Sequence, residues 1–202
     1  MKKIFPAIAL MLLFAGASLQ AAPYYGYAPP PSRMPQMDQA GPGQVLREGM
    51  TKLLKFMRQP ERPSQQQIEA FLQREIAPYF DFEYMAGWVA GPMNRQMNPQ
   101  QRAELAGNIE QMLLGTLTEK LAGYGNQDVR FFPPRRAGEN EVKVRVGILQ
   151  ASGYPASIDF RFYRGKGGWK VFDVSANGSS ALAFYRQYFS RQMDQRQMSY
   201  RR

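Results

Sequence analysis

Apolar residues recur at helical spacing through the first half of the chain. The recurrence every three or four residues predicts helices over residues 44–58, 64–77, 82–90 and 98–121. The apolar face of the first of these consists of Leu46, Met50, Leu53, Leu54 and Met57.

Start and stop signals bound these helices. Ser64 precedes the second helix and Gln67 follows three residues later, which is the spacing of a capping box. Pro78 ends that helix, because the residue before a proline resists the helical conformation. Asp81 can cap the third helix, and Asn98 followed by proline opens the fourth.

The period of the pattern then changes from 3.6 to 2. Apolar and polar residues alternate within residues 128–132, 141–150, 156–164 and 169–174, as in antiparallel strands that have one buried face. A last apolar stripe predicts a helix over residues 179–197. Helices, then consecutive strands, then a closing helix predict an α+β fold with a four-stranded antiparallel sheet.

The two ends of the chain read differently from its middle. Residues 1–22 have two lysines followed by an apolar run and small residues, which predicts a secretory signal peptide cleaved near Ala21 or Ala22. Residues 23–43 are rich in proline, tyrosine and glutamine and predict a flexible linker. We therefore expect an exported protein with one α+β domain at 44–197 and a tail at 198–202.

Composition excludes several kinds of chemistry. The 202 residues include no cysteine and no histidine, so disulfides, thiol nucleophiles, Cys/His zinc sites and Ser-His-Asp catalysis are excluded. Asp159 and Asp173 lie on adjacent predicted strands and could form a carboxylate pair. We assign Asp159 to the solvated face of the sheet and Asp173 to the following turn, and we expect no enzyme activity, no metal and no cofactor.

A net charge of +10 favours an acidic partner: nucleic acid, an anionic membrane surface or an acidic protein. Export argues against nucleic acid. The predicted solvated strand positions carry a row of cations: Lys143, Arg145, Arg161, Arg164 and Lys170. We interpret this row as a solvated face, and a polyanion-binding module remains the alternative.

The apolar residues leave two interpretations open. The chain has 12 methionines, whose flexible side chains suit a wall that must fit variable apolar cargo, but the same residues could simply pack together. Small residues on the third and fourth helices could leave room above the sheet or let the helices approach closely. They are Ala86, Gly87, Ala90, Gly91, Ala106 and Gly107.

Several segments, in order, resemble one protein family. They are Ile76–Ala86 (IAPYFDFEYMA), Val89–Gly91, Asn98–Arg102 (NPQQR), Gly168–Val174 (GWKVFDV), and Gly178 with Ser180 and Tyr185-Arg186. Together they are similar to the MlaC-like periplasmic phospholipid-transport proteins, also called toluene-tolerance proteins. The resemblance spans residues 64–193.

The resemblance implies a carrier for phospholipid. It implies a curved sheet, NTF2-like in outline, covered by helices around an apolar cavity that holds acyl chains. The implied partners are an inner-membrane ABC transporter with MCE domains and an outer-membrane lipoprotein complex, and the implied role is outer-membrane lipid asymmetry. We expect a periplasmic monomer. A carrier of another apolar ligand, such as a hopanoid or a solvent-like molecule, is an alternative on the same fold.

Helix and strand phase then predict which side chains face the cargo. The expected lipid-binding residues are Tyr79, Phe82, Met85, Ala86, Val89, Leu113, Leu117, Val144, Val146, Ile148, Phe160, Phe162 and Val171. Trp169, Asp173 and Gly178 are assigned to structural roles.

Overall fold

A computed structural model describes residues 41–125, 127–149 and 156–200, with side chains described up to residue 192. The predicted signal peptide lies outside the described residues, as do residues 23–40 of the predicted linker. The first helix, α1 (Pro42–Met57), begins two residues before its predicted start at 44.

Capping boxes start α2 (Gln65–Phe71) and α4 (Pro99–Ala122) where the sequence predicts the helices to begin. In α2 the backbone N–H of Gln67 donates to Ser64 Oγ at 3.3 Å, and the N–H of Ser64 donates to Gln67 Oε1 at 2.8 Å. The predicted capping box is therefore confirmed. Asn98 and Gln101 form a second box, at 2.8 and 2.9 Å, at the start of α4.

The segment between α2 and α3 is less regular than predicted. The chain passes from α2 into a π-helical turn, Leu72–Ile76, and a 3₁₀ turn, Ala77–Tyr79. Asp81 accepts from the N–H of Tyr84 at 2.9 Å and caps α3 (Phe82–Ala90), as expected. Gly91, at φ +55°, ends α3 and begins a 3₁₀ turn, Gly91–Arg95; a left-handed φ of this kind is most easily adopted by glycine.

The sheet is open and antiparallel, and within the described residues it has six strands. They are β1 (Val129–Phe131), β2 (Arg135–Arg136), β3 (Glu141–Ile148), β4 (Ala156–Gly165), β5 (Gly168–Ala176) and β6 (Ser179–Ser180). The spatial order is β1-β3-β4-β5-β6, and β2 pairs with the far end of β3. The predicted count of four strands is not confirmed, because β2 and β6 add two short strands.

Pairing register separates the two faces of the sheet. Val142, Val144 and Val146 on β3 lie opposite Phe162, Phe160 and Ile158 on β4, so all six point to one face. A bulge on β5 pairs Arg161 with Asp173 but Phe162 with Val171, which leaves Phe172 between the two pairs. Because of this extra residue, three consecutive residues of β5, Val171, Phe172 and Asp173, are all buried.

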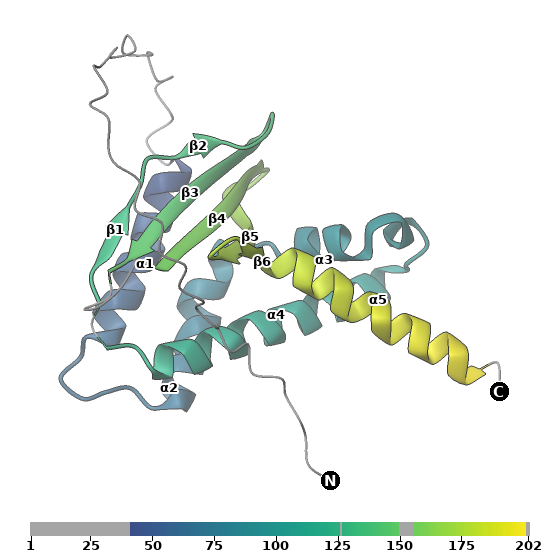
Figure 1. Ribbon diagram of the computed structural model, residues 1–202, viewed down its shortest axis with the longest axis horizontal. Coiled ribbons are helices and arrows are strands. Elements are labelled where there is room, and N and C mark those ends of the chain that lie inside the picture. The colour runs from purple at the N-terminus through teal and green to yellow at the C-terminus, as the bar shows by residue number, and fades with distance from the viewer. Residues whose placement is uncertain (1–40, 126, 150–155, 201–202) are drawn as a thin grey trace, which may run out of the picture. The chain divides into compact units, whose positions relative to one another are not determined.

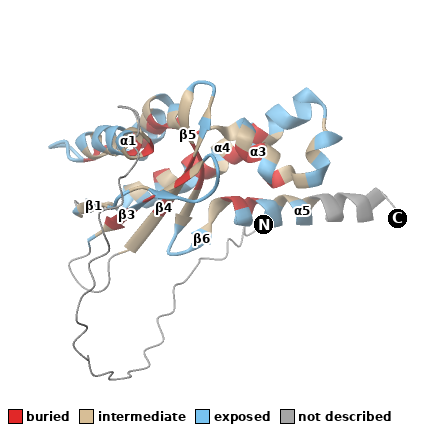
Figure 2. Ribbon diagram, turned by 90° about the horizontal axis from the view of Figure 1, so that it is seen from above, coloured by how far each residue is buried: buried red, intermediate tan, exposed pale blue. Residues whose placement is uncertain are grey.

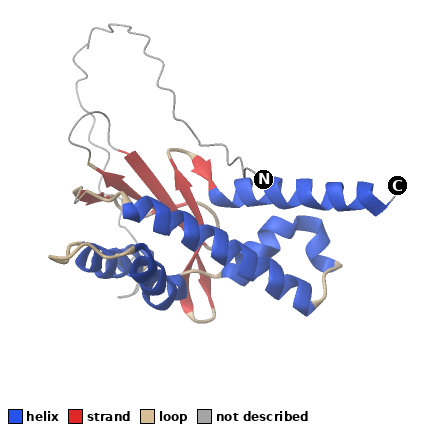
Figure 3. Cartoon of the chain, turned by 90° about the horizontal axis from the view of Figure 1, so that it is seen from below, coloured by secondary structure: helices blue, strands red, loops and turns tan. Residues whose placement is uncertain are grey.

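Helices cover the sheet and build a second core among themselves. Helix α1 lies along the face that carries Phe160 and Phe162, while α3 and the last helix, α5 (Ala181–Tyr200), lie beside β5 (Figures 1 and 3). Helices α2 and α3 pack against α4, and α5 packs against α3. Buried residues lie on β3, β4 and β5 and along α3 and α4 (Figure 2). Among the described residues, no helix is long and apolar enough to span a membrane.

Candidate functional site

A cavity of about 430 Å³ lies between α1 and the sheet. Its volume is in the range of small-molecule binding sites, roughly 300–1,000 Å³. Most of the side chains that line it are aliphatic or aromatic. Several of them, such as Met50, Ile158 and Phe160, are only half-buried because their exposed surface faces this space.

The first helix supplies one whole wall. Seven residues of α1 line the cavity, at the three- and four-residue spacing that brings side chains onto one face of a helix: Val45, Leu46, Gly49, Met50, Leu53, Leu54 and Met57. Sequence reasoning found this apolar face but gave it no role in the site. The signal was present in the same spacing that predicted the helix, together with two methionines.

The sheet and the helical turns close the cavity from the other sides. β4 contributes alternate residues, Ile158, Phe160 and Phe162, as strand geometry requires for one face. The turns after α2 bring Leu72, Ile76, Tyr79 and Phe80 to the wall. Phe80 forms a parallel bridge with Val171 of β5, which fixes these turns against the sheet.

The structure places six of the thirteen predicted lipid-binding residues on the cavity wall. They are Tyr79, Leu117, Ile148, Phe160, Phe162 and Val171. Their role in binding a lipid stays a prediction.

The other seven predicted residues pack elsewhere. Met85, Ala86, Val89 and Leu113 are buried in the core to which α3 and α4 contribute, and Phe82 stacks on Phe80. Val144 and Val146 point to the cavity face of the sheet, but surrounding residues cover them completely. Helical phase identifies a buried face without identifying which neighbour covers it, and this is why α3 was assigned to the wall.

The small residues of α3 and α4 are not part of the cavity. None of the six lines it, and Ala86 and Ala106 are buried where α3 packs against α4. Close approach of the helices fits Ala86 and Ala106, whereas Gly107 is exposed with open space beside it. Space for a ligand arises instead between α1 and the sheet.

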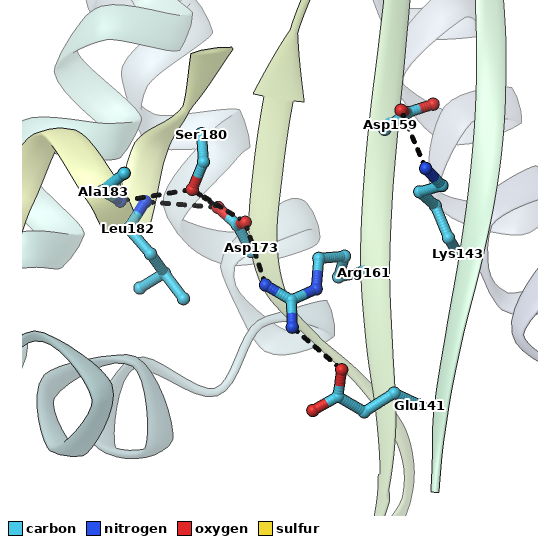
Figure 4. Close-up of polar contacts among 8 residues, drawn as sticks. All are labelled: Glu141, Lys143, Asp159, Arg161, Asp173, Ser180, Leu182 and Ala183. Carbon is cyan, nitrogen blue, oxygen red and sulfur yellow. Dashed lines mark hydrogen bonds and ion pairs between the residues drawn. The ribbon is translucent and has the colours of Figure 1, made fainter. Parts of the chain in front are cut away.

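The opposite face of the sheet carries charged residues that are paired with one another. Arg145 donates to both oxygens of Asp159, at 2.6 and 2.9 Å, and Lys143 Nζ lies 3.6 Å from Asp159 Oδ2. Arg161 contacts Glu141 at 2.8 Å and Asp173 at 3.5 Å (Figure 4). The predicted row of cations is therefore matched by carboxylates at three of its five positions.

The two aspartates considered for catalysis are both held by cations. The carboxylate of Asp173 is 1% exposed and accepts from Ser180 Oγ and from the N–H of Leu182 (Figure 4). It holds β6 and the start of α5, just beyond the Asn177–Gly178 turn to which it was predicted to bind. Asp159 lies on the predicted face but is more buried there than a solvated residue. No group of three or more carboxylates within the described ranges could hold a metal ion.

Acid sensitivity of the folded state is expected to depend on Arg145. Its hydrogen bonds to Asp159 lower the pKa of that carboxyl group, against the opposing effect of burial. A lowered pKa in the folded state stabilises the fold above the ordinary aspartate pKa of about 3.9, and this contribution is lost as pH falls through the folded-state value. Arg145→Gln should therefore show a smaller loss of unfolding free energy than the parent between about pH 5 and pH 2.

Urea unfolding at a series of pH values measures this effect. Arg130→Gln is a matched control, because Arg130 is an exposed arginine with no carboxylate partner among the described residues, and the substitution changes the net charge equally. Equal acid losses in the parent and in Arg145→Gln would contradict the prediction.

A hydrogen bond between the sheet and α3 fixes the start of that helix. The Tyr163 hydroxyl donates to Asp81, the N-cap of α3, while the Tyr163 ring stacks on Tyr84 at 4.0 Å between centroids. Burial, reinforced by Asp81, raises the pKa of Tyr163 well above its ordinary value. The hydroxyl thus stays protonated and remains a donor, which ties α3 to β4.

Comparison with known proteins identifies relatives of this fold. A sequence profile described as MlaC protein matches residues 47–200. A phospholipid-binding protein from Ralstonia solanacearum, solved in complex with a phospholipid, is similar in structure with a TM-score of 0.66 and 24% identity. The match covers 75% of this chain and 87% of that one. No curated protein matches the sequence.

Proposed function

This chain belongs to the MlaC protein family, and we propose that it is a lipid carrier that holds the acyl chains of a phospholipid in the cavity between α1 and the sheet. The observation that carries the proposal is the apolar cavity itself, within a fold that a phospholipid-bound protein shares. The six predicted residues on its wall, together with the apolar face of α1, are the proposed contacts.

The energetics of lipid transfer favour a carrier of this design. A phospholipid with two chains exposes on the order of 28 methylenes, and at about 0.8 kcal/mol each their transfer to water costs roughly 20 kcal/mol. That is near the upper limit of non-covalent affinity, so free lipid does not cross water readily. A cavity that replaces the bilayer with apolar walls makes the transfer nearly isoenergetic and requires no catalytic group.

The family and the leader sequence support a proposal about the wider setting. We propose a periplasmic monomer, exported by residues 1–22, that exchanges lipid with an inner-membrane ABC transporter bearing MCE domains and with an outer-membrane lipoprotein complex. Its proposed role is to support outer-membrane lipid asymmetry, and an NTF2-like outline is the proposed description of its fold. The direction of transport must then come from ATP use by the transporter.

Charge pairing on the sheet argues against the polyanion-binding alternative. Lys143, Arg145 and Arg161 are each matched with a carboxylate, and Lys170 Nζ donates to the carbonyl of Pro78 at 2.6 Å. The three cations paired with carboxylates add little net positive charge that could attract phosphates. We therefore expect no nucleic-acid partner.

Lipid extraction from protein expressed with its own leader tests the function. We expect mass spectrometry of an organic extract to find phospholipid at close to one molecule per protein. A hopanoid or another non-phosphorylated apolar molecule in its place would support the alternative cargo. A lipid-free protein that also takes up nothing from phosphatidylglycerol vesicles would contradict the proposal.

A further inference from the structure

Charge is distributed very unevenly around the cavity. Among the described residues that line it, Lys120 is the single charged one. The remaining polar side chains of the wall are Tyr79, Tyr124 and Gln127, and both tyrosine hydroxyls are already hydrogen-bonded: Tyr79 to Glu48 at 3.2 Å and Tyr124 to the carbonyl of Gln127 at 2.8 Å. A lone cation beside an otherwise apolar space is therefore the feature that distinguishes one end of the site.

Exposure identifies that end as the mouth of the cavity. Of the described lining residues, Lys120 and Gly123 are the exposed ones, and both belong to the C-terminal end of α4. The lining residues Phe80, Phe162 and Val171, by contrast, are buried. An amphiphile that places its chains against these buried residues would bring its polar group to the end of α4.

The ammonium group of Lys120 has no carboxylate partner within the described part of the chain. Two of the five other described lysines do: Lys52 lies 3.8 Å from Glu48 and from Glu75, and Lys143 is paired with Asp159. A long lysine side chain can cover apolar surface with its methylenes and still reach water with its charge. The methylenes of Lys120 can thus cover the cavity wall while its ammonium group contacts a charged group outside the cavity.

Stabilisation of the helix end explains Lys120 poorly. Cations are favoured near a helix C-terminus, where backbone carbonyls lack partners. In α4, however, the Arg62 guanidinium already donates to the carbonyls of Ala122 and Tyr124, and the carbonyl of Lys120 accepts from the N–H of Gly123. The end of the helix is capped without the ammonium group.

We propose that Lys120 binds the anionic group of the lipid whose chains occupy the cavity. This inference rests on the proposed function and adds the class of ligand: an amphiphile with an anionic phosphate or carboxylate at the polar end. A charge-assisted contact at the mouth would favour anionic lipids over neutral lipids with the same chains.

Binding of three lipids to the purified mature protein tests the proposal. The probes are phosphatidylglycerol, diacylglycerol with the same chains, and the corresponding fatty acid, all measured by displacement of a fluorescent acyl probe. Lys120→Gln should weaken phosphatidylglycerol binding about fivefold, the upper end for loss of an exposed ion pair, and should leave diacylglycerol binding unchanged. Lys120→Arg should retain most of the affinity, and the effect should shrink at high salt.

Lys55→Gln is the matched control, because Lys55 is an exposed lysine in the last turn of α1 that does not line the cavity. Weaker binding of phosphatidylglycerol assigns Lys120 to a phosphate, and weaker binding of the fatty acid alone assigns it to a carboxylate. Equal losses for diacylglycerol would show a packing role and overturn the proposal, as would no change with any lipid. If the parent binds no phospholipid, the proposed function fails instead.

Discussion

Phe160→Asp is expected to reduce phospholipid binding by about 100-fold or more. Phe160 lies on the cavity wall in the middle of β4, and it is only half-buried because one side of its ring faces the cavity. An aspartate there must lose its hydration when acyl chains enter, or take up a proton. A cost of about 3 kcal/mol, at the lower end for burying a carboxyl group without a partner, corresponds to roughly a 100-fold loss of affinity.

Binding is measured with the fluorescent acyl probe and by lipid recovered from purified protein, and urea unfolding checks the fold. Phe132→Asp is the control, since Phe132 is an exposed phenylalanine next to β1 that does not line the cavity. Met50→Asp, on the wall formed by α1, should produce a similar loss if Phe160→Asp proves too unstable to measure. Normal lipid recovery with both folded wall variants would exclude the cavity as the binding site.

The local structure of the helices was predictable because it depends on a few adjacent residues. A capping box needs only Ser64 and Gln67 at the right spacing, and the stop at Gly91 needs only the absence of a Cβ atom. These interactions act within one turn, so tertiary packing has little opportunity to override them. The predicted boundaries of α3 and α4 accordingly agree with the structure within about one residue.

The cavity was harder to predict because it depends on which helices leave space between themselves and the sheet. Apolar spacing identifies one buried face on α1 and one on α3, and the two faces have the same pattern of apolar residues in the sequence. In the folded chain α3 packs directly against α4. Helix α1 is separated from β4 by the cavity that both elements line. The difference arises from long-range packing, which the spacing of residues within one helix does not record.

One missed strand had a readable signal. Asn177 and Gly178, at φ +49° and +88°, form the tight turn that joins β5 to β6. Asn-Gly is typical of the two-residue turns of β-hairpins, because both positions then adopt positive φ at low cost. The tight turn predicted at Gly178 is confirmed, but the strand β6, rather than the predicted helix, follows it immediately. The two residues of β6 are too few to show an alternating pattern.

Asp173→Ala is expected to lower the free energy of unfolding by about 3 kcal/mol, the upper end for the loss of hydrogen bonds to a charged group. The Asp173 carboxylate is nearly inaccessible and holds three groups: Arg161, the Ser180 hydroxyl and the N–H of Leu182. Together these contacts attach the start of α5 to β5 (Figure 4). Without the carboxylate, the Leu182 N–H loses its acceptor and Arg161 keeps only Glu141.

Smaller changes at the same junction separate charge from hydrogen bonding. Asp173→Asn keeps one acceptor oxygen and should cost less than alanine, whereas Ser180→Ala should cost only about 1 kcal/mol, as for loss of a helix cap. Ser180 Oγ also accepts from the N–H of Ala183, so part of its loss is independent of Asp173. Either alanine substitution alone already removes the Ser180–Asp173 hydrogen bond. In a double-mutant cycle measured by urea unfolding, the two substitutions should therefore cost less together than the sum of their separate effects. Additive losses, or a cost below about 1 kcal/mol for Asp173→Ala, would mean that packing of Leu182 and Tyr185 rather than this carboxylate attaches α5 to the sheet.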